Sequence, residues 1–176
     1  MTEQNGGDNY PLWTPLLSVF LSLAIYTIGT YLLSGFGWIA VLLYISFCFW
    51  AEYQVISKSC VNCYYYGKLC GPGKGKIAPL FFKKGDPKFF TARNIGWKDL
   101  IPDLLIFLIP LIGGIIYLFI RFNFLALALI TAIAVLALPG TGFMRSCFLC
   151  PNCKQRELGC PAQKLFGKNS SCPPSP

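Results

Sequence analysis

Histidine is absent from this chain of 176 residues. A protein without imidazole cannot build a bis-histidine haem site, a CxxCH haem attachment or a zinc finger of the mixed cysteine and histidine kind. It also lacks the Ser-His and Cys-His pairs that activate nucleophiles in many hydrolases. Any transition-metal site must therefore use mainly sulfur ligands, which select zinc, iron–sulfur clusters or copper(I) over magnesium and calcium.

Charged residues are also scarce. They make up 12% of the chain, whereas 55% of the residues are hydrophobic and 16% aromatic, and the mean hydropathy is +0.55. Such a chain is too apolar for an ordinary soluble domain. Four apolar segments are each close to the roughly 20 residues that a membrane-spanning helix needs; they cover 12–33, 38–55, 100–120 and 124–144. We therefore expect an all-α integral membrane protein with four transmembrane helices arranged as two hairpins.

The predicted organisation places a cysteine-rich segment after each hairpin. We expect a disordered N-terminus, transmembrane hairpin 1, a loop rich in Cys, Lys and aromatic residues, transmembrane hairpin 2, a second cysteine-rich segment and a disordered tail, at 1–11, 12–56, 57–99, 100–144, 145–168 and 169–176. The connection between the two helices of each hairpin is short, so the two helices must be antiparallel neighbours.

Positive charge is concentrated beside the cysteines. Of the 15 Lys and Arg residues, 14 lie in 58–98 or 145–168, and the exception is Arg121 at the tip of the second hairpin. Cytoplasmic loops carry the excess of Lys and Arg in membrane proteins. We therefore expect a multi-pass protein of the cell membrane with both termini and both cysteine-rich segments in the cytoplasm. The net charge of +8 is interpreted as this topology signal and as attraction to anionic lipid headgroups, not as nucleic-acid binding.

Two cysteine motifs share the spacing C-x2-C-x6-C. The first consists of Cys60, Cys63 and Cys70; the second consists of Cys150, Cys153 and Cys160, with Cys147 three residues ahead of it as a further candidate ligand. Laying Cys60 on Cys150 also lays Asn62 on Asn152. The match indicates an internal duplication that would bring both motifs together at one site or at two close sites; convergence on similar metal loops is the alternative.

These cysteines are predicted to bind metal, because cytoplasmic thiols stay reduced unless a metal holds them. The second motif, read from Cys147 to Pro161, is C-x2-C-x2-C-x6-C-P and resembles a bacterial ferredoxin run, although a ferredoxin has three residues in the last gap where this chain has six. The resemblance implies an iron–sulfur cluster on Cys147, Cys150, Cys153 and Cys160, with Cys60, Cys63 and Cys70 as a second set. In outline the chain also resembles the membrane ferredoxin subunits of respiratory chains, which implies electron transfer with other subunits of a membrane complex or with a soluble redox partner.

Zinc is the alternative metal. The Cys60–Cys63 and Cys150–Cys153 pairs each look like a zinc or rubredoxin knuckle, and two knuckles make one four-cysteine site. The protein would then be a structural or assembly subunit without redox activity. A thiol-dependent metal-ion carrier, as in small mercury or copper transporters, is a third hypothesis, and it is weakened because Cys48 is the only cysteine within the predicted spans.

Three other features carry hypotheses. Glu52 and Asp103 lie within predicted spans, where acids serve as proton or cation sites or else pair with flanking cations and helix dipoles. The alternating glycines of 71–75 are expected to let the backbone donate N–H groups to sulfur. In 77–90, apolar side chains are interleaved with lysines, which predicts contact with anionic lipid or, alternatively, a partner-binding surface.

Overall fold

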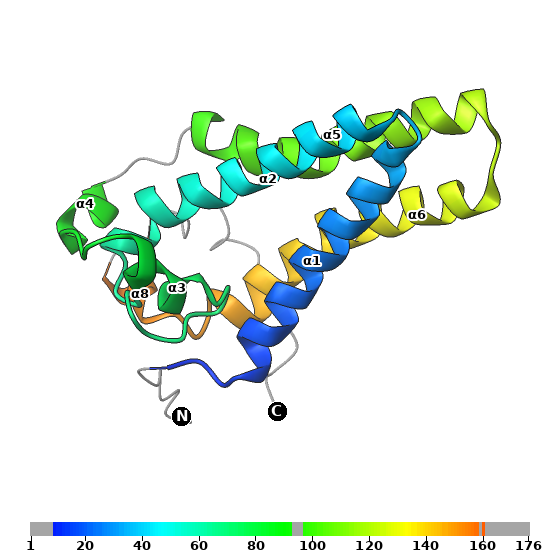
Figure 1. Cartoon of the computed structure of the whole chain (residues 1–176). Coiled ribbons are helices and arrows are strands. Elements are labelled where there is room, and N and C mark those ends of the chain that lie inside the picture. Colours follow the sequence, from blue (N-terminus) through cyan, green and yellow to red (C-terminus); the bar gives the residue numbers. More distant parts are fainter. Residues whose placement is uncertain (1–8, 93–96, 159, 161–176) are drawn as a thin grey trace. The chain divides into compact units, whose positions relative to one another are not determined.

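The structure, a computed structural model, describes residues 9–92, 97–158 and 160 (Figure 1). Its regular elements are helices, and no strand occurs among the described residues. Four helices are long and apolar enough to cross a membrane. The prediction of an all-α, multi-pass membrane protein is confirmed at this level. The predictions for 1–8 and for the tail 169–176 fall outside the described residues.

The long helices agree with the predicted spans at most of their ends. They are α1 (Trp13–Ser34), α2 (Trp38–Lys58), α5 (Trp97–Ile120) and α6 (Phe124–Val135). The fourth span differs, because helical backbone continues from α6 through η2 (Leu136–Gly140), α7 (Thr141–Phe143) and η3 (Met144–Leu149). The wider π-type turn of η2 contains Pro139, whose missing N–H breaks the ordinary α-helical pattern. Cys147 therefore lies on a helix rather than in a loop.

The short elements belong to the segments predicted to be cysteine-rich. They are η1 (Cys60–Asn62), α3 (Lys74–Phe81), α4 (Pro87–Ala92) and α8 (Lys154–Glu157). Near α3 and α4, Leu80, Phe81 and Phe89 are 78%, 73% and 70% exposed. Exposed apolar side chains next to lysines are what an interfacial segment needs. Contact with lipid stays a prediction.

Contacts within the chain divide it into two compact units. The first, here called the apolar unit, comprises Phe20–Tyr53 and Gly96–Thr141. The second, here called the cysteine unit, comprises Met1–Val19, Gln54–Ile95 and Gly142–Pro176. The cysteine unit therefore combines the start of the chain with segments from both of its halves.

The apolar unit has one core, to which all four long helices contribute. Its members include Ile25, Leu33, Tyr44, Cys48, Ala51, Ile106 and Ile133. Helices α1 and α2 approach closely at Gly29, where a Cβ atom would lie 2.5 Å from Oη of Tyr44. The hydroxyl of Tyr44 in turn donates to the carbonyl of Ile106 on α5 at 2.8 Å. Cys48 is buried in this core, as expected of a small apolar residue.

Candidate metal centre

The cysteine unit has a small aromatic core of its own. Tyr10, Tyr65 and Leu149 are buried, and their partly buried neighbours are Cys63, Tyr64, Cys70 and Cys153. The rings of Tyr10 and Tyr65 lie 5.5 Å apart between centroids. The hydroxyl of Tyr10 donates to the carbonyl of Leu149 at 2.6 Å. Side chains from three separate segments of the chain thus cover the thiols.

Both C-x2-C pairs form the same local structure. The N–H of the second cysteine donates to the carbonyl of the first, at 3.3 Å in the turn that ends at Cys63 and at 3.4 Å in the turn that ends at Cys153. The asparagine before that cysteine donates its side-chain amide to the carbonyl four residues earlier, at 3.4 Å for Asn62 and 3.2 Å for Asn152. The two motifs therefore share their hydrogen bonds as well as their spacing.

The residues that follow the two turns are bonded to each other. The N–H of Tyr64 donates to Oε1 of Gln155 at 2.8 Å, and the N–H of Lys154 donates to Oη of Tyr65 at 3.2 Å. Tyr64 and Lys154 occupy equivalent positions in the two motifs, and so do Tyr65 and Gln155. Tyr65 and Gln155 are each 2% exposed, so water does not compete for these bonds. We call this reciprocal pair of bonds the interlock.

The interlock holds thiols of both motifs near one another. The pKa of Cys63 is raised to about 11, mainly by burial; the N–H of Tyr65 lowers it, and the neighbouring thiols of Cys153, Cys70 and Cys160 contribute to the rise. These neighbours raise the pKa because negative charge on several close sulfurs is unfavourable. A bound cation removes that repulsion, since it holds thiols in their deprotonated form.

Cys70 receives additional support from the backbone. Its Sγ accepts the N–H of Gly75 at 3.1 Å. Burial raises the pKa of Cys70, and the N–H groups of Gly75, Gly73 and Lys74 oppose that rise because they stabilise a thiolate. Gly75 is required at its position, since a Cβ atom there would collide with the carbonyl oxygen of Tyr65. The expected donation of N–H groups to sulfur is thus observed at Cys70.

The thiols of Cys63, Cys70, Cys153 and Cys160 do not converge on a single point. Within 9–92, 97–158 and 160, no three His, Cys, Asp or Glu side chains are close enough together to hold a metal ion directly. A tetrahedral zinc needs Zn–S distances of about 2.3 Å, which puts its sulfurs roughly 3.8 Å from one another. A cluster of several irons spaces its cysteines more widely, because iron and sulfide atoms lie between them.

The remaining predicted ligands have different environments. Cys60 and Cys150 are partly exposed. The pKa of Tyr10 is raised by burial and, to a smaller extent, by Cys153 and Cys150, so Cys150 lies near this ring. Cys147 is disulfide-bonded, and a disulfide sulfur is not the thiolate that a metal needs. Its role as a metal ligand stays a prediction.

Two residues of the centre were not apparent from the cysteine pattern. Gln155 lies two residues after Cys153, as Tyr65 lies two residues after Cys63, so comparing the residues after the two motifs would have pointed to it. Tyr10 carries no sequence signal, because nothing along the chain links it to Leu149.

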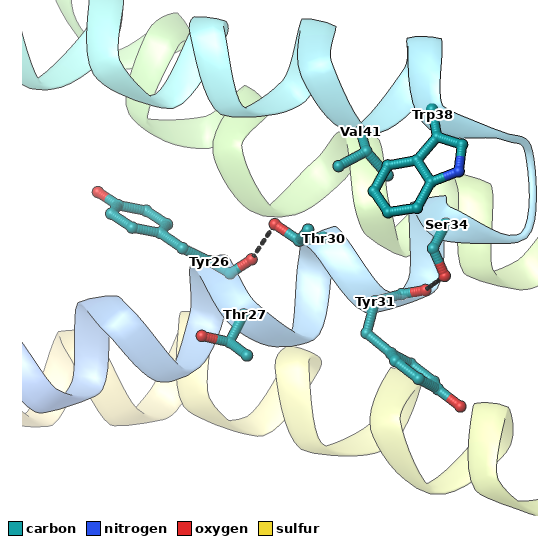
Figure 2. Close-up of a pocket in the computed structure, with 7 residues that line it drawn as sticks. All are labelled: Tyr26, Thr27, Thr30, Tyr31, Ser34, Trp38 and Val41. Atoms are coloured by element: carbon teal, nitrogen blue, oxygen red, sulfur yellow. Dashed lines mark hydrogen bonds between the residues drawn. The ribbon is translucent and has the colours of Figure 1, made fainter.

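Glu52, the acid predicted within the second span, is hydrogen-bonded in the apolar unit. Its Oε1 accepts the hydroxyl of Tyr26 on α1 at 2.5 Å. Tyr26 also borders a groove of about 440 Å³ whose lining contains no cysteine (Figure 2). The hydroxyls of Thr30 and Ser34 in this groove donate to carbonyls of their own helix. The groove is therefore lined by hydroxyl oxygens that can accept hydrogen bonds and by apolar side chains, and it contains none of the predicted cysteine ligands.

Comparisons with known proteins identify no relative. No protein-family model matches the chain, and searches of curated proteins and of solved structures gave no match. The functional argument therefore depends on the geometry of the cysteine unit.

Proposed function

We propose that this protein is a membrane-embedded electron-transfer protein that binds an iron–sulfur cluster in its cysteine unit. The proposed ligands are Cys63, Cys70, Cys153 and Cys160. The observation that carries the proposal is the interlock, together with the group of thiols around Cys63. The choice of a cluster over a single ion follows the resemblance of the second motif to a bacterial ferredoxin run.

The proposed centre uses two cysteines from each motif. An internal duplication accounts for this arrangement, because a repeated hairpin followed by a repeated C-x2-C-x6-C motif supplies two equivalent half-sites. The shared turns and the reciprocal bonds between Tyr64 and Gln155 and between Lys154 and Tyr65 support this origin. Neither motif alone would then bind the cluster.

The protein's residues would protect the centre and set its charge. The rings of Tyr10 and Tyr65 exclude water from the sulfurs, and the N–H of Gly75 stabilises the charge on Cys70. The iron–sulfur cluster itself would supply one-electron transfer. Four membrane-spanning helices would hold it at the cytoplasmic surface, where the partner is another subunit of a membrane complex or a soluble redox protein.

Metal and sulfide analysis tests this function. We expect several irons per chain and a matching amount of acid-labile sulfide in protein purified anaerobically in detergent. Cys63→Ser and Cys153→Ser should lose both the iron and the sulfide, because each substitution removes one of the proposed cysteine ligands of the cluster. Cys147→Ser is the matched control from the same segment, and it should keep them, since Cys147 is disulfide-bonded in the structure.

Zinc would identify the second candidate function. The interlock also favours a structural site, because it fixes two distant segments to each other as a closed zinc site does. About one zinc per chain without sulfide would contradict the electron-transfer proposal and support a zinc-stabilised structural or assembly subunit. The cysteine variants would then lose stability together with zinc.

A further inference from the structure

The side-chain amide of Gln155 is fixed in orientation. Its Oε1 accepts the N–H of Tyr64 at 2.8 Å, and a backbone N–H can only be satisfied by an acceptor, so the oxygen and nitrogen cannot be exchanged. The side chain is 2% exposed, and Nε2 has no hydrogen-bond partner in the described part of the chain. A buried amide nitrogen without an acceptor costs free energy, so its presence indicates an acceptor that completes the site.

The neighbours of this amide indicate which acceptor it would meet. Sγ of Cys63 lies 3.8 Å from Oε1 of Gln155, which puts the amide beside a proposed ligand. The thiol of Cys63 is the donor in that contact. Once the proton is lost to a metal centre, the sulfur becomes an acceptor and the two N–H groups of Nε2 are the complementary donors.

We propose that Nε2 of Gln155 donates a hydrogen bond to a sulfur of the bound cluster and raises its reduction potential. This inference rests on the proposed function, because it requires a redox-active centre at Cys63. An N–H···S bond stabilises the reduced state, in which the cluster carries more negative charge. Gln155 is therefore a positioning residue that acts on the cluster without being one of its ligands.

The test is the reduction potential of the cluster in Gln155→Glu and Gln155→Met, measured by redox titration followed by electron paramagnetic resonance. Glu keeps the acceptor for Tyr64 but loses the donor, and Met loses both without adding charge. We expect both potentials to be more negative than that of the wild type. A tenfold fall in the equilibrium constant for reduction corresponds to about 59 mV for a one-electron couple.

Thr131→Ala is the control variant. Thr131 is exposed on α6 in the apolar unit, and its hydroxyl donates to the carbonyl of Leu127 at 3.0 Å. The substitution changes no residue of the cysteine unit, so the reduction potential should equal that of the wild type. A purely structural role for Gln155 would lower cluster occupancy in its variants and leave the potential of the remaining clusters unchanged.

The outcomes separate this inference from the proposed function. Equal potentials in the wild type and in both variants would overturn the inference and leave the electron-transfer proposal intact. Wild-type protein without iron and sulfide would overturn both. If neither variant folds, pulsed paramagnetic resonance of wild-type protein labelled with amide-¹⁵N glutamine decides: a ¹⁵N coupling to the cluster supports the bond, and its absence overturns it.

Discussion

Cys63 shows how surroundings, rather than spacing, single out a ligand. Cys60 and Cys63 belong to one turn, and both have a counterpart in the second motif, Cys150 and Cys153. Cys63 contacts Gln155 and is influenced by three further thiols. Burial and close sulfurs both favour the neutral thiol, so a metal must displace a proton that is held unusually tightly.

At this scale we predict an alkaline reactivity profile for Cys63. In metal-free folded protein its alkylation by iodoacetamide should have a midpoint near 11 instead of the ordinary 9.0, because only the thiolate reacts and the pKa is raised by burial. Site-specific alkylation rates measured by mass spectrometry against pH check this. Denatured protein should show the ordinary midpoint.

The same shift affects stability. The folded state binds this proton more tightly than the unfolded chain, so the contribution of Cys63 is present below the ordinary pKa of 9.0 and is lost as pH rises toward about 11. A folded, metal-free protein in which Cys63 titrates near 9 would contradict the environment described here.

At the scale of elements, the turn before α3 connects glycine content to the metal centre. Gly73 has a φ of 77°, a conformation that glycine adopts readily, and Gly75 lies against the backbone carbonyls of Tyr65 and Lys68. Together they wrap the chain around Cys70, so that the backbone can donate to its sulfur. The alternating glycines in the sequence predict this role, and the structure identifies Cys70 as the sulfur that accepts the N–H of Gly75.

We predict that Gly75→Ala will disrupt the centre. A Cβ atom at this position would lie 2.8 Å from the carbonyl oxygen of Lys68 and closer still to that of Tyr65, and backbone atoms cannot move aside cheaply. The N–H of residue 75 would shift away from Cys70, with a cost on the order of 1–3 kcal/mol in stability. Metal content per chain and the thermal unfolding of detergent-solubilised protein measure the effect.

Gly142→Ala is the matched control in the same unit. Nothing lies within 4 Å of a Cβ atom built at Gly142, and the residue is helical, so Ala should be neutral or slightly stabilising. Full metal occupancy in Gly75→Ala would show that the contact between Gly75 and Cys70 is dispensable.

At the scale of the whole molecule, the charge distribution determines the expected orientation. The cysteine unit carries most of the Lys and Arg residues, whereas the apolar unit has Lys98 and Arg121. The excess of Lys and Arg on the cysteine unit predicts that this unit faces the cytoplasm.

Alkaline phosphatase fusions test that orientation. Fusions after Gly37 and after Arg121 should be active, because this reporter needs an oxidising compartment to form its disulfides, and a fusion after Lys58 should be inactive. Enzyme activity normalised to fusion abundance is the measurement. The reverse pattern would place the cysteine unit outside the cytoplasm and would favour disulfides over a cluster.

Much of the fold was predictable and part of the site was not. The spans follow from apolar runs of sufficient length, since a helix satisfies its backbone hydrogen bonds locally wherever water is absent. The predicted fourth span ended at Met144, whereas helical backbone continues to Leu149 through a second π-type turn that has no sequence signature. Among the seven predicted cysteine ligands, Cys153, Cys70 and Cys160 influence Cys63, a grouping across both motifs that spacing within one motif does not give.

The sequence by itself determined a four-span helical membrane protein with two equivalent thiol motifs, because hydropathy and cysteine spacing are properties of local chain segments. The tertiary structure decided which thiols approach one another and which other residues surround them. Tyr10, Tyr65 and Gln155 reach the thiols from distant parts of the chain, through contacts such as that between Tyr10 and Leu149. Such contacts depend on how segments far apart in the chain pack together, and spacing within one segment cannot encode that.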